Sequence, residues 1–189
     1  MKRVSIAVLA ASITVVSINA SDDASVKQEG IKYIKMLGGA LKTELKTHMK
    51  RDSSGLEALG FCTASAEKIT DEVNAKLPKY AKVRRTALKV RNDKRNAPDE
   101  TDIEVMFKYD AKAKEGALSP QDIEVVTVGD TTRIYKPLVT KKVCLKCHGS
   151  TLDPKITEAL KGAYPKDHAR GFKEGDLRGV IVAEIKSHH

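Results

Sequence analysis

Aromatic side chains are scarce in this chain of 189 residues, which has no tryptophan, three phenylalanines and 4% aromatic residues in total. A surface that stacks nucleic-acid bases needs aromatic rings, so this composition argues against a nucleic-acid-binding module even though the net charge is +9. We expect the positive charge to meet acidic partner proteins, anionic lipid or the carboxylates of a cofactor instead. Internal repeats and low-complexity segments are also absent, and the length predicts a single domain.

Long apolar runs are absent after the N-terminal segment. The basic start Met1-Lys2-Arg3 is followed by a mostly apolar stretch over residues 4–18, and Ala20 precedes a polar segment. The apolar stretch is shorter than the roughly 20 residues that a membrane-spanning helix needs. A basic, then apolar, then small-residue order is typical of a secretory signal peptide. We therefore predict a signal peptide over residues 1–20 and a periplasmic domain over residues 21–189 that has no stable membrane span.

Cysteine is also rare, and two of the three cysteines lie in Cys144-Leu145-Lys146-Cys147-His148. This spacing is that of c-type haem attachment. Two residues between the cysteines allow one short helical turn to present both thiols to the two vinyl groups of a porphyrin. His148 then lies under the ring and offers its imidazole to the iron. The motif predicts one covalent haem c, held by Cys144 and Cys147, with His148 as an axial ligand.

A zinc site, a redox dithiol and a structural disulfide fit the cysteine pair less well. A zinc site needs a second pair of cysteines or histidines at ligand spacing, and the sequence has none. A thioredoxin-like motif needs a strand directly before it and a helix running from it, whereas Pro137 and Lys141-Lys142 precede this motif and Gly149 follows it. A disulfide between the two cysteines would close a very small loop and would stabilise the chain little. Haem c is attached outside the cytoplasm, which agrees with the predicted export.

A second axial ligand must carry sulfur or nitrogen. The candidates are Cys62, Met36, Met49, Met106, His48, His168, His188 and His189. The methionines and histidines also fit ordinary packing or solvent-exposed positions, and Cys62 fits a small buried residue on one stripe of a helix. Cys62 differs from the others because it is an unpaired cysteine in a chain predicted to be exported, where cysteines are usually paired or reactive. The residues by themselves leave the choice open.

Hydrophobic periodicity predicts helices first and then strands and hairpins, which is the arrangement of an α+β fold with an antiparallel sheet. The predicted helices cover residues 26–49, 56–77, 100–109 and 154–164. The predicted strands cover residues 82–90, 123–128, 132–138 and 178–185. The middle two strands form a hairpin at Gly129-Asp130, and the last strand is expected to alternate between apolar and polar residues.

Several segments of the chain, taken in order, resemble one known family. They are Leu37-Gly38-Gly39-Ala40-Leu41, Phe61-Cys62, residues 83–92, Asn96-Ala97-Pro98-Asp99, Tyr135-Lys136-Pro137-Leu138, residues 144–149 and residues 170–179. Together they are similar to a bacterial family of haem-binding domains of unknown function, first seen in cyanobacteria. The resemblance implies a PAS-like antiparallel sheet with long N-terminal helices packed beside it. It also implies a haem c with His/Cys ligation, in which His148 is the proximal ligand and Cys62 the distal one.

Two arginines are candidates to hold this cofactor. Arg84 and Arg85 are neighbours on the strand predicted at residues 82–90, so their side chains face opposite sides of the sheet. One of them is a candidate partner for a haem propionate. A solvated basic strand face accounts for the pair equally well.

The expected iron site indicates the class of function. A thiolate ligand predicts a low reduction potential, and two protein ligands leave no open position on the iron. We therefore expect a periplasmic sensor of redox state or of a small ligand, with a soluble electron-transfer cytochrome c as the alternative and a peroxidase-like enzyme disfavoured. The sensor would need a separate signalling partner, because no output domain follows the motif. The electron carrier would need a redox partner protein.

Overall fold

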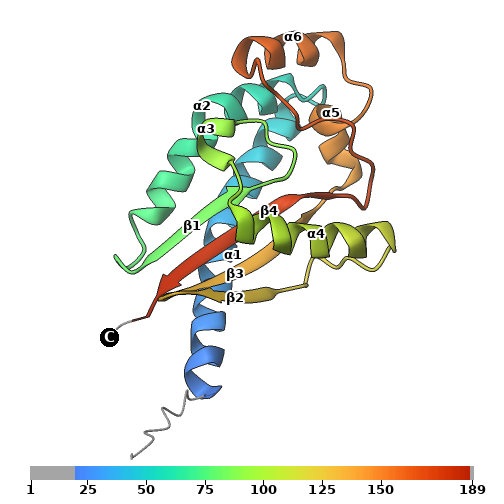
Figure 1. Cartoon of the computed structure of the whole chain (residues 1–189). Coiled ribbons are helices and arrows are strands. Elements are labelled where there is room, and N and C mark those ends of the chain that lie inside the picture. The colour runs from blue at the N-terminus through green and yellow to red at the C-terminus, as the bar shows by residue number, and fades with distance from the viewer. Residues whose placement is uncertain (1–19, 188–189) are drawn as a thin grey trace, which may run out of the picture.

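The computed structural model describes residues 20–187 as an α+β fold, in agreement with the predicted class (Figure 1). The helices within these residues are α1 (Ala20–Arg51), α2 (Leu56–Asn74), α3 (Asp93–Asn96), α4 (Glu100–Lys114), the 3₁₀ turn η1 (Lys142–Cys144), α5 (Leu145–His148) and α6 (Pro154–Ala163). The strands are β1 (Ala81–Thr86), β2 (Glu124–Val128), β3 (Thr131–Val139) and β4 (Leu177–Lys186).

The four strands form one antiparallel sheet in the order β1-β4-β3-β2. The last strand of the chain therefore lies between the first strand and the β2–β3 hairpin. Because β4 is central and both of its faces are covered, seven of its ten residues are buried, five of them in one run at residues 179–183. The alternation of apolar and polar residues predicted for this strand is wrong for that reason, since a strand covered on both faces reads as a nearly continuous apolar run.

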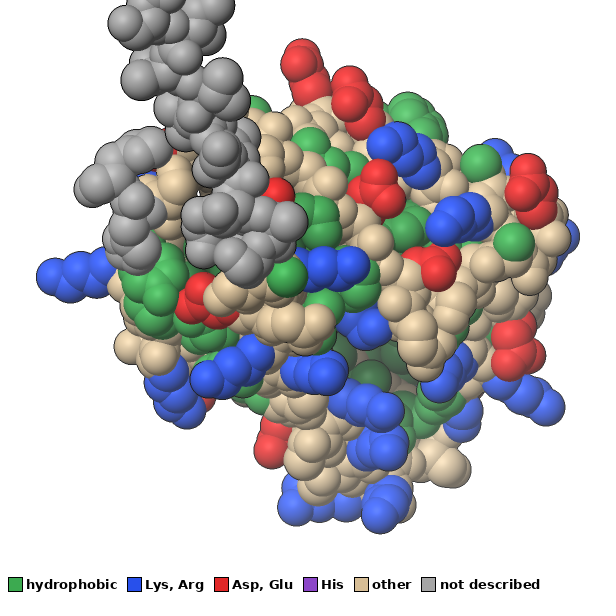
Figure 2. Space-filling model, turned by 90° about the horizontal axis from the view of Figure 1, so that it is seen from below, with side chains coloured by type: hydrophobic (Ala, Val, Ile, Leu, Met, Phe, Trp, Pro, Cys, Tyr) green, Lys and Arg blue, Asp and Glu red, His purple; other side chains and the backbone are tan. Residues whose placement is uncertain are grey.

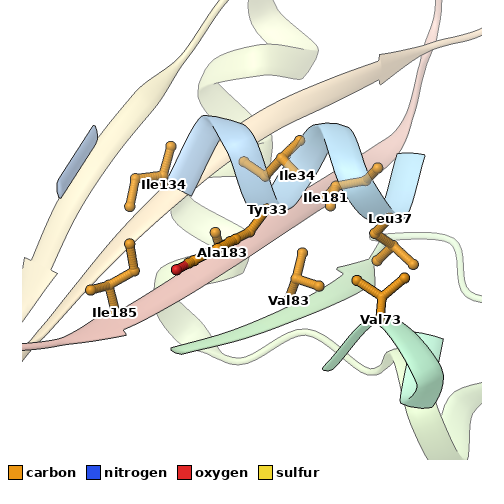
Figure 3. Packing of buried hydrophobic residues seen from close by; sticks show 9 residues of the cluster. All are labelled: Tyr33, Ile34, Leu37, Val73, Val83, Ile134, Ile181, Ala183 and Ile185. Atoms are coloured by element: carbon orange, nitrogen blue, oxygen red, sulfur yellow. The ribbon is translucent and has the colours of Figure 1, made fainter. Parts of the chain in front are cut away.

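Helices cover both faces of the sheet (Figure 1). On one face, α1 and α2 pack against β1, β3 and β4. Figure 3 shows the buried cluster between them, which consists of Tyr33, Ile34, Leu37, Val73, Val83, Ile134, Ile181, Ala183 and Ile185. On the other face, α4 closes a second cluster, which consists of Val105, Met106, Tyr109, Tyr135, Leu177, Val180 and Val182.

A β-bulge interrupts the pairing of β4 with β3. Leu138 pairs with Gly179 and Val139 pairs with Leu177, so Arg178 is the extra residue of β4. An extra residue reverses the direction of the side chains that lie beyond it. Leu177 consequently joins the cluster under α4, and Arg178 turns to the opposite face, toward the segment that holds the Cys-x-x-Cys-His motif.

A buried ion pair fastens α4 to the sheet. Asp102 of α4 is fully buried and accepts two hydrogen bonds from the Arg84 guanidinium, at 2.8 and 2.9 Å. The hydroxyl of Tyr135 donates a third, at 3.0 Å. The Nε of Arg84 donates to Glu184 of β4 at 2.7 Å. The carboxylate of Asp102 also closes a capping box with Asp99 at the start of α4, so one residue sets both the beginning and the docking of this helix.

The predicted hairpin and the main helices are confirmed, with shifted ends. The strand predicted at residues 82–90 ends at Thr86, because its neighbour β4 has the bulge just beyond that point and residues 87–92 leave the sheet. The first helix begins at Ala20 rather than at residue 26. The predicted signal peptide falls on residues 1–19, which lie outside the described residues, and on Ala20. Among residues 20–187, none of the helices has the length and apolar character needed to cross a membrane.

Candidate functional site

The Cys-x-x-Cys-His motif lies on two short helical turns, η1 and α5, that follow the end of β3. Cys144 ends the first turn and Cys147 lies on the second, so the two thiols come from adjacent turns and not from the single turn that the spacing predicts. All three cysteines are free thiols and half-buried. Gly149 ends α5, and a Cβ at this position would lie 2.6 Å from the Leu145 carbonyl oxygen. A glycine therefore allows the chain to turn away directly after His148.

The imidazole of His148 has one nitrogen held by the backbone. Its Nδ1 lies 2.8 Å from the carbonyl oxygen of Ala169, which can only accept a hydrogen bond. Nδ1 therefore carries the proton and Nε2 carries the lone pair. The Nε of Arg178 lies 3.2 Å from Nδ1 and 3.5 Å from Nε2, so the lone pair of Nε2 accepts a long hydrogen bond from Arg178. Burial lowers the pKa of His148 well below its usual range, and the charges of Arg178 and Arg91 lower it further. The imidazole is thus neutral at physiological pH, which is the form that binds iron.

Cys62 of α2 lies near the motif although it is far away in the sequence. Burial raises the pKa of the Cys62 thiol, and the neighbouring charge of Cys147 raises it further, while Arg85 and Arg91 act in the opposite direction. An apolar wall of Leu59, Ile156 and Leu160, from α2 and α6, packs against Cys147. The structure therefore brings the predicted distal ligand and the predicted attachment segment together on one side of the sheet.

Buried positive charge surrounds this site. The Nε of Arg85 is buried and has no hydrogen-bond partner among residues 20–187. Burial lowers the pKa of Arg178 to about 10, and the charges of Arg91 and Arg85 contribute to this shift. Arg91 is paired with Asp167 at 3.1 Å. Asp167 offsets one guanidinium, so the arginines as a group leave a surplus of positive charge that an anion with two carboxylates would neutralise.

Of the two adjacent arginines on β1, only Arg85 faces this site. Arg84 points to the opposite face, where Asp102 and Glu184 occupy its guanidinium. Arg178 was not predicted as a site residue, because an arginine at the start of a strand gives no signal by itself. The one hint is that it precedes Gly179, since glycine within a strand often marks a bulge.

The remaining candidate ligands are placed differently. His48 stacks on Phe61 at 4.7 Å and its Nδ1 lies 2.8 Å from Glu57, so its ring is already engaged. Met106 is buried under α4, on the far face of the sheet. Met36 packs against the cluster beneath α1, and His168 is exposed. His188 and His189 lie outside the described residues.

Met49 is the remaining sulfur near the motif. A Cβ built on Gly55 would lie 3.8 Å from both the sulfur of Met49 and the Sγ of Cys147. Within residues 20–187, no group of three or more His, Cys, Asp or Glu side chains is arranged to hold a metal ion by itself. Met49 therefore competes with Cys62 as a sulfur ligand and has to be tested beside it.

The chain is similar to one known protein family and to one solved structure. The sequence model of the Tll0287-like family matches residues 4–185. The fold is also similar to the crystal structure of the cyanobacterial heme-protein Tll0287, with a TM-score of 0.64 and 22% sequence identity over 90% of this chain and 98% of that one. No curated protein sequence is a significant match. The two chains share their fold over almost their whole length.

Proposed function

The chain belongs to the Tll0287-like family, and on that premise we propose that it binds one haem c through Cys144 and Cys147, with His148 and Cys62 as the axial ligands of the iron. The observation that carries the proposal is that α2 brings Cys62 to the motif. Leu59, one turn before Cys62, belongs to the cluster against which Cys147 packs, and the charge of Cys147 acts on the Cys62 thiol. Nothing in the hydrophobic core requires a cysteine of α2 to lie beside the motif, whereas a ligand on the far side of a porphyrin does.

The residues of the site fit this cofactor. Cys144 and Cys147 are free thiols, and the neutral imidazole of His148 would offer Nε2 to the iron in place of its long contact with the Nε of Arg178 at 3.5 Å. Arg85 and Arg178 supply buried positive charge for the two propionates. Leu59, Ile156 and Leu160 supply an apolar wall for the ring. When bound, the haem supplies an iron that is oxidised and reduced by one electron.

The proposed ligands of the iron favour one class of function. As a thiolate, Cys62 favours the ferric form, and we expect a low reduction potential. Ligands on both sides leave no open position, so a small molecule reaches the iron only if Cys62 leaves. Cys62 lies on α2, which packs on α1 and α6, so its release would be felt by those helices. We therefore favour a PAS-like sensor of redox state or of a small ligand, exported to the periplasm after removal of the signal peptide at residues 1–20.

A soluble electron-transfer cytochrome is the second candidate, and the basic surface favours it. In Figure 2, Lys and Arg side chains gather around a hollow on the face seen from below, which is the end of the molecule away from α5 and α6 (Figure 1). Beside the motif itself, Lys141, Lys142 and Lys146 are exposed. Such a surface attracts an acidic redox partner. The two functions differ in one property of Cys62, which stays bound during redox cycling in a carrier and leaves in a sensor.

The proposal is tested with full-length protein made in cells that mature c-type haem. The wild type is expected to keep its colour after acid–acetone extraction and to give a low-spin thiolate signal in EPR. Cys62→Ser is expected to lose that signal, whereas Met49→Leu is expected to keep it. Colourless protein of unmodified mass would overturn the haem assignment. A thiolate signal that survives in Cys62→Ser would overturn the assignment of the distal ligand.

Carbon monoxide added to the reduced protein separates the two candidate roles. Binding to the wild type at a rate close to that of Cys62→Ser shows that Cys62 has left, as a sensor requires. If the reduced wild type excludes carbon monoxide while Cys62→Ser binds it, Cys62 stays in place and the electron carrier is favoured.

A further inference from the structure

A buried ion pair lies directly behind the motif. Arg91, in the segment after β1, and Asp167, in the loop before β4, are 12% and 1% exposed, and the Arg91 Nε donates to Asp167 at 3.1 Å. Arg170 donates to the other oxygen of Asp167 at 2.9 Å. The pair connects two segments that are far apart in the sequence.

The same two side chains fix both backbone groups of Ala169, which is itself fully buried. Asp167 accepts a hydrogen bond from the Ala169 amide at 2.9 Å. The Nη2 of Arg91 donates to the Ala169 carbonyl at 3.2 Å and to the Cys147 carbonyl at 2.6 Å. The Ala169 carbonyl is also the acceptor for His148. One carbonyl oxygen is therefore shared between a guanidinium and the imidazole of the expected proximal ligand.

Sharing this oxygen changes what His148 is able to do. A carbonyl that already accepts from a cation is a weaker acceptor for the imidazole N–H, so the imidazole keeps less negative charge and donates less to a metal at Nε2. Asp167 opposes this effect, because its carboxylate offsets the charge of Arg91. The pair thus sets both the orientation and the donor strength of His148.

We propose that Arg91 and Asp167 are positioning residues that tune the iron through the Ala169–His148 hydrogen bond and through their opposite charges, an inference that rests on the proposed function of His148. The two halves of the pair are predicted to act in opposite directions. Arg91 disfavours ferric iron and so raises the reduction potential, and Asp167 lowers it.

The test is a redox titration of haem-loaded, full-length variants. Arg91→Gln is expected to make reduction less favourable by about tenfold in its equilibrium constant, which is about 59 mV for one electron. Asp167→Asn is expected to make reduction more favourable by a similar factor. The double variant is expected to lie near the wild type. A purely structural pair would instead shift both single variants in the same direction, and that outcome would overturn the proposal.

Matched controls come from an exposed ion pair of the same kind. Arg95 and Asp71 lie 3.2 Å apart and are 53% and 59% exposed. Arg95→Gln and Asp71→Asn are expected to leave the potential unchanged, because solvent screens their charges. If these control variants shift the reduction potential as much as the variants of the buried pair do, any nearby charge is sufficient to change the potential. That result would overturn the proposed role of Arg91 and Asp167.

A second readout needs no cofactor and separates this inference from the proposed function. In the haem-free full chain, ¹⁵N NMR of His148 is expected to show the proton on Nδ1 in the wild type and a mixture of tautomers in Asp167→Asn, whose Ala169 carbonyl is no longer fixed. An unchanged His148 spectrum in both single variants would overturn the positioning role even if haem is bound. Failure of the chain to bind haem, together with a changed spectrum, would overturn only the proposed function.

Discussion

At the scale of single residues, the two neighbouring arginines of β1 have opposite roles. The guanidinium of Arg84 satisfies Asp102, which is fully buried, whereas the Nε of Arg85 is buried without a partner among the described residues. In the haem-free chain, Arg84→Gln is expected to reduce the free energy of unfolding by about 3 kcal/mol, because it removes the two-bonded cation of a buried carboxylate and leaves only the more distant Arg133 at 3.7 Å. Arg85→Gln is expected to change it by less than about 1 kcal/mol. Urea unfolding followed by circular dichroism measures both values.

The comparison of these variants is internally controlled, since the two positions are adjacent and the substitutions identical. Equal losses from both variants would contradict the assignment of Arg84 to the core and of Arg85 to the cofactor site.

The charge of Asp167 is expected to make the free energy of unfolding depend on pH. Burial raises the pKa of Asp167, but hydrogen bonds from Arg91 and Arg170 outweigh burial, and the pKa lies below its ordinary value. A carboxyl whose pKa is lowered by folding stabilises the fold fully above its unfolded pKa, and this contribution is lost as the pH falls through the folded pKa. Asp167→Asn is therefore expected to be less stable than the wild type at pH 7, with a difference that shrinks below about pH 4.

Thermal unfolding of both proteins between pH 3 and pH 7 measures this difference. Asp71→Asn, at the exposed ion pair with Arg95, serves as the control and is expected to show little difference at any pH. A gap between the wild type and Asp167→Asn that stays constant over the whole range would show that Asp167 acts through its shape and not through its charge.

At the scale of secondary-structure elements, the bulge in β4 connects the sheet to the site. Gly179 has a φ of 154°, and a Cβ there would lie 2.5 Å from the Thr86 carbonyl oxygen, a backbone atom that cannot move aside. Gly179→Ala is expected to reduce the free energy of unfolding by roughly 2 kcal/mol. It is also expected to disturb the site, because the bulge directs Arg178 toward His148.

Gly162 provides the contrast for this substitution. It lies in α6, and a Cβ there would meet nothing within 4 Å. Gly162→Ala is expected to stabilise the chain by up to about 1 kcal/mol, since alanine is the better helix former. Denaturant unfolding compares the two variants. Equal effects of the same sign would contradict the strained geometry at Gly179.

The elements that the sequence predicted best are those with local signals. The helical stripe of α1 and the hairpin at Gly129 are visible in short windows of sequence, as is the presence of a last strand, although the alternation predicted for it is wrong. The central position of β4, its coverage on both faces and its bulge were not predicted, because they depend on which strands become neighbours after the whole chain has folded. The relationship to a cyanobacterial haem-protein family was predicted, and it is confirmed by the family match.

In the candidate site too, the residues with a local sequence signal were predicted, and those placed by tertiary contacts were not. Cys144, Cys147 and His148 were predicted from a motif with fixed spacing and Cys62 from the family resemblance, and their roles stay predictions. Arg91, Asp167 and Arg178 are single residues in segments without periodicity, and the carbonyl of Ala169 has no side-chain signal at all. Such contacts are set by tertiary structure and become visible only once two distant segments lie together.

At the scale of the whole molecule, the site is separate from the main core. The two clusters that bury the faces of the sheet contain no residue of the motif. The site instead lies at one end, where α2, α5, α6 and the loop before β4 meet. The fold therefore has most of its buried apolar surface in place before a cofactor binds.

This separation predicts the behaviour of the haem-free protein. The full-length variant Cys144→Ala/Cys147→Ala is expected to keep the helix and strand content of the wild type, because both sheet clusters remain intact. Hydrogen exchange is expected to stay slow in β1, β3 and β4. It is expected to become faster in α5, α6 and residues 164–172, which are tied to the rest mainly by hydrogen bonds around His148 and Asp167.

Wild-type chain produced without haem maturation is the matched control for this variant, because it lacks the cofactor but keeps the thiols. The two are expected to show the same exchange pattern, which would attribute the loss of protection to the missing cofactor and not to the substitutions. Loss of protection throughout β3 and β4 in both proteins would instead mean that the fold depends on the cofactor as a core element. The sheet clusters would then be insufficient to hold the chain, and the site could not act as a local switch on a stable scaffold.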